Sequence, residues 1–69
     1  MIDVTTRLCA IQRNPASGIT WIKLLGDDDF EWIISQHPDT PADYIAIGGV
    51  NNGSFRMIKK ATIDSMIGE

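Results

Sequence analysis

The chain has little cysteine, and its first residues do not show the pattern of a signal peptide. Its 69 residues include one cysteine, Cys9, so an intrachain disulfide is excluded. Small secreted domains usually depend on such bridges. Residues 1–7 lack a basic region followed by an apolar run, and no stretch approaches the roughly 20 apolar residues that span a bilayer. The sequence therefore predicts a cytoplasmic protein that does not associate with membranes.

Basic residues are missing from the middle of the chain, between Lys23 and Arg56. The formal net charge is −3, which disfavours direct binding to phosphate backbones and favours contact with basic surfaces. We therefore expect no direct binding of nucleic acid and a basic protein partner, of the kind that itself binds nucleic acid. The acidic residues in this interval are Asp27, Asp28, Asp29, Glu31, Asp39 and Asp43.

No catalytic, cofactor or metal signature is visible. Cys9 and His37 are the only side chains that could form a thiol–imidazole pair, but Cys9 is expected to be buried in a strand and His37 to lie at a helix end. The acidic run 27–31 does not have the spacing of a calcium-binding EF-hand loop. Gly48-Gly49 is followed by a strand rather than the helix that a phosphate loop requires. We expect a non-enzymatic protein without cofactor or metal, with a His37 or Cys9 activity as a remote alternative.

Length and composition fit one small domain over residues 1–69. The hydrophobic fraction of 43% and the charged fraction of 22% are ordinary for a globular protein. Apolar, β-branched runs at 4–12 and 19–25, separated by turn-forming residues, predict two strands. In the second, Ile22 and Leu24 face one side of the sheet and Trp21 the other.

A helix is predicted over residues 28–36. An aspartate in the run 27–29 would cap it, apolar residues recur at helical spacing from Phe30 onward, and Pro38 would end it. On such a helix Trp32 either projects sideways among carboxylates, as an interface hot spot would, or folds over the rim of the core.

The C-terminal half predicts a turn, a hairpin and a short helix. Residues 40–43 favour a single turn that leads into a strand. Asn52-Gly53 favours a type I′ hairpin turn, and a bulge at Gly48-Gly49 would place Ile47 opposite Met57, with the apolar residues on one face. Residues 62–67 predict a short helix ended by Gly68. The expected fold is α+β, ordered β-β-α-β-β-α, with a three- or four-stranded, mostly antiparallel sheet and the main helix packed on one face.

These features favour a protein-binding module or inhibitor that acts as a nucleic-acid mimic. A very small acidic domain suits a phage or mobile element that inhibits a host defence or transcription protein. The alternative is a small structural or regulatory subunit that forms a homodimer through strand 19–25, with Trp21 and Lys23 in contact. The predicted partner-binding residues are Asp27, Asp28, Asp29, Glu31, Trp32, Asp39 and Asp43.

Overall fold

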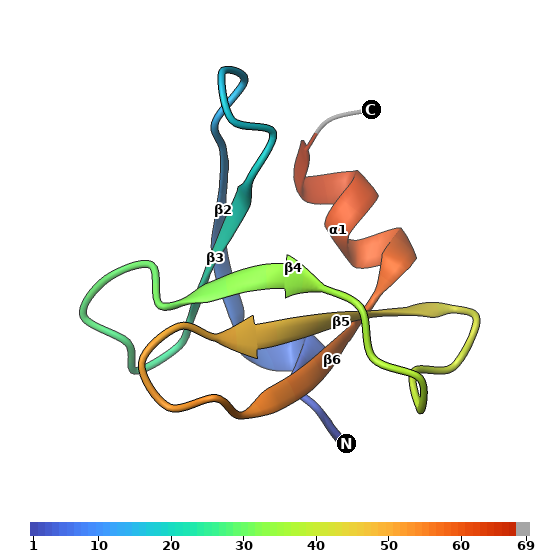
Figure 1. Cartoon of the computed structure of the whole chain (residues 1–69). Helices are drawn as coiled ribbons and strands as arrows, with labels where there is room; N and C mark the ends of the chain where they lie inside the picture. Colours follow the sequence, from blue (N-terminus) through green and yellow to red (C-terminus); the bar gives the residue numbers. More distant parts are fainter. Residues whose placement is uncertain (68–69) are drawn as a thin grey trace.

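The computed structural model describes residues 1–67, which form a curled six-stranded sheet with a C-terminal helix (Figure 1). The strand order is β1-β6-β5-β4-β3-β2. Neighbouring strands are antiparallel except β1 and β6, which are parallel. The elements are β1 (Ile2–Asp3), the 3-10 helix η1 (Thr5–Arg7), β2 (Leu8–Arg13), β3 (Thr20–Leu24), β4 (Trp32–Ser35), β5 (Tyr44–Gly49), β6 (Phe55–Lys59) and α1 (Lys60–Ile67).

The path of the N-terminal segment explains the curl. β1 and β2 form opposite edges of the sheet, yet only Val4 and η1 separate them in the chain. Because each residue spans at most about 3.6 Å, the two edges must approach each other. The Val4 N–H donates to the Met57 carbonyl at 2.9 Å, and the Leu25 N–H donates to the Arg7 carbonyl at 2.6 Å. The result is a half-barrel with an inner and an outer face.

The inner face holds the core. Along β3 the side chains at Thr20, Ile22 and Leu24 are buried, whereas Trp21 and Lys23 are half-buried on the outer face. This alternation confirms the predicted division of the strand. The core is closed by α1, which contributes Ile63. The buried apolar residues that pack together in this core are Val4, Ile22, Leu24, Trp32, Ile47, Ile58 and Ile63.

The predicted three- or four-stranded sheet with a main helix on one face is wrong. Most of the segment 28–36 is occupied by β4 and by the loop before it, and β4 pairs with both β3 and β5. A short apolar run fits either structure by periodicity alone. The bulky neighbours Trp32, Ile33 and Ile34 suit a strand that is covered on both faces.

The predicted short C-terminal helix is confirmed as α1, the one α-helix within residues 1–67. It begins at Lys60, directly after β6, and its first N–H donates to the Asp43 carbonyl at 3.0 Å. The predicted end at Gly68 lies outside the described residues.

The β5–β6 hairpin is confirmed, but the predicted register is wrong. Ile47 lies opposite Arg56 rather than Met57, and Met57 lies opposite Ala46. The pairing continues without a shift from Tyr44 to Gly48, so no bulge forms. The apolar residues therefore divide between the two faces, and both faces of this hairpin are partly apolar.

Of the two turns predicted next to β5, the turn before the strand is confirmed, and the turn between β5 and β6 has a different conformation. Gly53 has a φ of 68°, whereas no residue other than glycine within residues 1–67 has a positive φ. A type I′ turn needs positive φ at both central residues, so Asn52-Gly53 does not form one, and the connection spans residues 50–54. The predicted turn before β5 is confirmed by the Tyr44 N–H, which donates to the Pro41 carbonyl at 3.0 Å.

A hydrogen-bonded carboxylate fastens β1. Asp3 accepts hydrogen bonds from the Thr5 hydroxyl and from the Thr5 N–H, the latter at 2.8 Å, and from the Tyr44 hydroxyl at 3.3 Å. The Thr5 hydroxyl contributes most to lowering the pKa of Asp3, followed by the Thr5 N–H. Because these bonds favour the charged form, the pKa is lower in the folded than in the unfolded protein. The resulting stabilisation is complete above the unfolded pKa and is lost as pH falls through the folded pKa.

Asp3→Asn is expected to lower stability at neutral pH and to have a smaller effect once the pH falls below the lowered pKa of the folded Asp3 carboxyl group, where the wild-type carboxylate is protonated. Urea denaturation at a series of pH values measures the difference. Asp64→Asn, at an exposed position of α1, is the control. A wild-type-minus-variant difference that stays constant from pH 7 to pH 2 would contradict this role.

Candidate functional site

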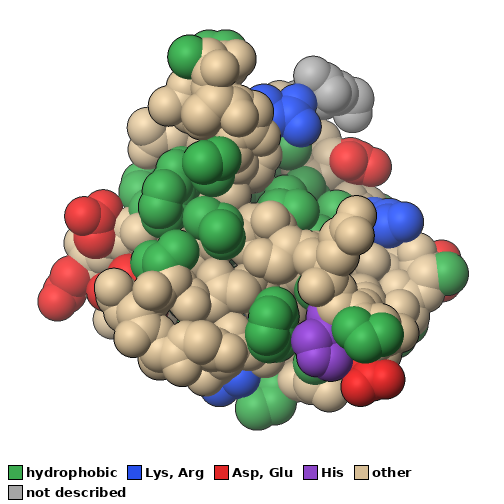
Figure 2. All heavy atoms as spheres, viewed as in Figure 1, with side chains coloured by type: hydrophobic (Ala, Val, Ile, Leu, Met, Phe, Trp, Pro, Cys, Tyr) green, Lys and Arg blue, Asp and Glu red, His purple; other side chains and the backbone are tan. Residues whose placement is uncertain are grey.

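The structure separates the predicted partner-binding residues into two groups at opposite ends of β4. The acidic loop, residues 27–31, connects β3 to β4, whereas Asp39 and Asp43 lie in the β4–β5 connection (Figure 1). β4 has 4 residues, so the groups are separated by roughly 13 Å of strand. Figure 2 shows acidic side chains on the left, where the acidic loop lies, and others on the right. The predicted acidic residues thus lie in two separate connections.

Within the acidic loop, Asp27 differs from its neighbours. Its Oδ2 atom accepts hydrogen bonds from the Leu24 N–H and from the Trp32 indole N–H, both at 3.1 Å. Asp27 is half-buried, whereas Asp28 and Asp29 are exposed. Asp27 therefore holds the loop against the core, and the other two carboxylates face solvent.

Trp32 belongs to the core. Its side chain is 8% exposed, so the expectation that it projects sideways from a helix is wrong. The guanidinium carbon of Arg56 lies 5.7 Å from the ring centroid, within the range of a cation–π interaction. This position is closer to the alternative prediction, in which the Trp32 side chain folds over the rim of the core. Its participation in partner binding stays a prediction, and it would act mainly through the position of the acidic loop.

An apolar row crosses the outer face between the two acidic groups. Trp21 lies opposite Ile33, Ile33 opposite Gly48, and Gly48 opposite Phe55. Directly opposed residues of antiparallel strands project to the same face. Trp21 and Ile33 are half-buried, and Phe55 is 36% exposed. These four residues form a surface that we call the outer row.

Gly48 leaves a hollow of about 160 Å³ in the outer row. Ile33, Ser35, Val50 and Phe55 are among the residues that line it. A Cβ atom at Gly48 would lie 3.0 Å from Ser35 Oγ and 3.4 Å from Phe55 Cε1. A side chain at this position would therefore press against Ser35 and Phe55 and take up part of the space, so the absence of a side chain keeps the hollow open.

Acidic residues adjoin the hollow at both ends. At one end the Val50 N–H donates to the Glu31 carbonyl at 3.0 Å, which joins the acidic loop to the wall of the hollow. At the other end the His37 ring packs against Phe55, with 4.8 Å between ring centroids. The Asp39 N–H donates to His37 Nδ1 at 3.3 Å. The two acidic groups thus flank one apolar surface.

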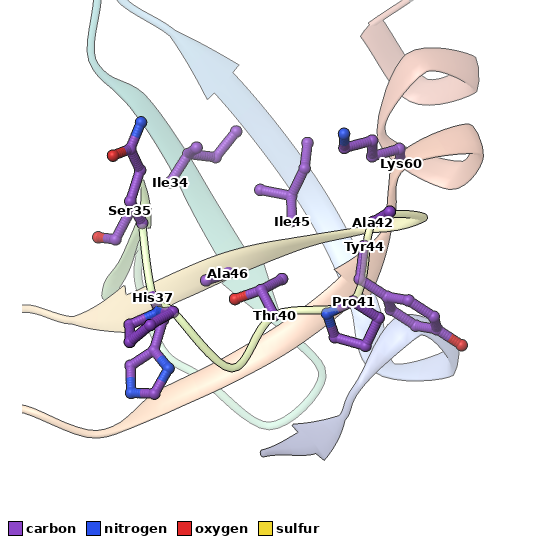
Figure 3. Close-up of a pocket in the computed structure, with 12 residues that line it drawn as sticks. Ile34, Ser35, His37, Thr40, Pro41, Ala42, Tyr44, Ile45, Ala46 and Lys60 are labelled. Carbon is purple, nitrogen blue, oxygen red and sulfur yellow. The ribbon is translucent and has the colours of Figure 1, made fainter.

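A larger groove of about 820 Å³ lies beside the β4–β5 connection. Figure 3 shows Ile34 and Ile45 pointing towards the side of α1, while His37 points the opposite way. Lys60 is the one charged side chain among the lining residues. Thr40 Oγ1 has no hydrogen-bond partner within residues 1–67 and is enclosed by protein atoms, so it is not exposed to a molecule in the groove.

Cys9 and His37 are not brought together. Cys9 lies on the edge strand β2 and is exposed, so the expectation of burial is wrong. A register shift between Leu8 and Ala10 takes Cys9 out of the regular pairing of β2 with β3. His37 lies in a loop against Phe55 rather than at a helix end. In the described part of the chain, no group of three or more His, Cys, Asp or Glu side chains could hold a metal ion.

No protein-family model, curated protein or solved structure matches the chain. The described helices include none with the length and apolar character needed to cross a membrane. A cytoplasmic location stays a prediction.

Sequence reasoning identified the acidic residues and Trp21 but missed Ile33, Gly48 and Phe55 as one surface. One sequence feature could have indicated this surface: the run of three large apolar residues at 32–34 is typical of a strand that is covered on both faces. The outer row itself depends on pairing among four strands.

Proposed function

We propose that this protein is a non-enzymatic binding module that docks on a basic protein partner through the outer row and the acidic residues beside it. The observation that carries the proposal is the apolar surface between two groups of carboxylates. Interfaces commonly combine an apolar centre with a polar rim. Carboxylates beside that apolar centre favour a partner of the opposite sign and speed its encounter.

The chemistry of the rim indicates the class of partner. Asp28 and Asp29 are exposed, and a protein that binds phosphate backbones presents clustered lysine and arginine side chains. Occupation of such a surface would block nucleic acid from it. The proposed role is therefore inhibition of a nucleic-acid-binding protein, as a phage or mobile element would use against a host defence or transcription protein.

The half-buried Trp21 supports a second candidate, a homodimeric structural or regulatory subunit. β3 lies between β2 and β4, so both of its backbone edges are paired and contact would come from Trp21 and Lys23 on the outer face. Two copies meeting there would also bring acidic groups together, which is unfavourable. A dimer at micromolar concentration that Trp21→Arg dissociates without unfolding would favour this candidate.

Affinity capture from a cytoplasmic lysate tests the first candidate, with Asp28→Lys and Asp64→Lys as variants of equal charge change. Wild type is expected to retain a basic protein at low salt and to release it at high salt. Asp28→Lys should weaken the affinity for that protein about tenfold at low salt, whereas Asp64→Lys on α1 should leave it within about twofold. Equal effects of both variants would contradict a specific role for the acidic loop.

A further inference from the structure

We propose that the hollow at Gly48 is a specificity pocket that accepts one apolar side chain from a basic segment of the partner. This inference rests on the proposed function and adds the chemistry of the segment that makes contact. Its basis is the shape of the hollow together with the charges at its two ends.

The hollow has the size and lining for one side chain. Its volume of about 160 Å³ is close to that of an apolar protein cavity, about 150 Å³, that binds benzene. Ile33, Val50 and Phe55 supply the apolar part of its lining, and the other lining residues are Ser35, Gly48, Gly49, Gly53 and Ser54. A leucine, methionine or phenylalanine side chain fits this space and chemistry, and such an anchored apolar side chain is typical of an interface hot spot.

The flanking charges identify what surrounds that apolar residue. Glu31 adjoins the pocket through its backbone contact with Val50, and Asp39 adjoins it through His37 and Phe55. β4 lies between these acidic residues and has 4 residues, so each end is roughly 7 Å from the middle, about two residues of extended chain. The complementary segment carries lysine or arginine on both sides of the apolar residue, at a spacing of about two residues or more.

The same charges disfavour the other occupants. A second copy of this chain could offer Leu25, which is 65% exposed, but the acidic loop begins two residues later. A nucleic-acid strand would place phosphates beside Glu31 and Asp39. A basic peptide segment is the occupant that satisfies both the pocket and its rim.

Two synthetic peptides test the pocket by amide chemical-shift titration of the ¹⁵N-labelled protein. One has the sequence Gly-Lys-Gly-Leu-Gly-Lys-Gly with blocked ends, and the other carries glutamine in place of leucine. The leucine peptide is expected to shift the amides of Ile33, Gly48 and Phe55 and to bind at least tenfold more tightly than the glutamine peptide. Gly48→Ala, which places a methyl group inside the pocket, should reduce this preference to about twofold or less.

Control variants distinguish binding in the pocket from a general attraction between the acidic protein and a basic peptide. Thermal unfolding checks that Gly48→Ala is folded. If it is not, the variant Val50→Ser replaces it, because Val50 lies at the rim of the pocket and is 46% exposed. Ile19→Ala is the control variant outside the pocket. Equal binding of the two peptides to wild type, with shifts confined to residues 27–31, would overturn the pocket and leave the proposed function standing. If neither peptide binds at millimolar concentration, both the pocket proposal and the proposed function are overturned. If the protein self-associates with shifts at the same amides, a second copy is the occupant and the pocket proposal is overturned.

Discussion

Replacing Ile47 by alanine is expected to lower the free energy of unfolding by about 2–5 kcal/mol, because the change removes buried methyl groups and leaves a cavity. Ile47 is 0% exposed and lies in the middle of β5. It stands opposite Ile34 of β4 and Arg56 of β6, so its loss affects three strands. In a domain of this size such a change removes a large part of the total stability.

Urea denaturation followed by tryptophan fluorescence measures the effect. Ile19→Ala is the matched control because Ile19 is 41% exposed and precedes β3, and its effect should stay within about 0.5 kcal/mol. If Ile47→Ala and Ile19→Ala lower the free energy of unfolding by similar amounts, Ile47 does not lie in the core on the inner face of the sheet.

Asp27→Ala is expected to lower the free energy of unfolding by about 1–3 kcal/mol, because it leaves buried hydrogen-bond donors without an acceptor. The donors are the Leu24 N–H and the indole N–H of Trp32, which is 8% exposed. The same variant should alter the fluorescence of Trp32, because its indole N–H loses the Asp27 carboxylate as hydrogen-bond partner.

Asp28→Ala controls for the lost charge, since Asp28 is exposed and belongs to the same loop. We expect it to leave stability within about 0.5 kcal/mol. Asp27→Asn, which retains a side-chain oxygen acceptor, should fall between the two. If Asp27→Ala and Asp28→Ala are equally stable, the carboxylate does not hold the acidic loop to the core.

Local sequence signals predicted the elements that are formed by neighbouring residues. The run at 19–25 contains β3, and the pattern at 62–67 lies within α1. The run at 4–12 overlaps most of β2, but its first part forms the 3-10 helix η1 and β2 extends one residue beyond it. In each case residues close in sequence determine the structure, through strand alternation, turn formers or helical spacing. The β5–β6 hairpin was predicted for the same reason.

β4 could not be recognised in this way. Aspartates before it resemble a helix start, but Asp27 uses its carboxylate to bind Leu24 and Trp32 across the loop. The strand conformation is decided by pairing with β3 on one side and β5 on the other, and tertiary pairing overrides a short local preference.

The candidate site likewise combines features that are visible in the local sequence with features that depend on strand pairing. The acidic residues are visible in the sequence because charge is a property of composition. Their separation by β4, and the alignment of Trp21, Ile33, Gly48 and Phe55, follow from register across four strands. A shift of one residue in any strand would move its side chain to the other face, so no local pattern could specify this surface.

The most direct test of the central claim is chemical-shift mapping of the ¹⁵N-labelled protein with the partner recovered by affinity capture. Docking on the outer face predicts that the largest changes fall at Ile33, Gly48 and Phe55 and in the acidic loop. Changes concentrated at the β2–β3 turn, residues 14–19, with the outer row unaffected, would contradict the claim.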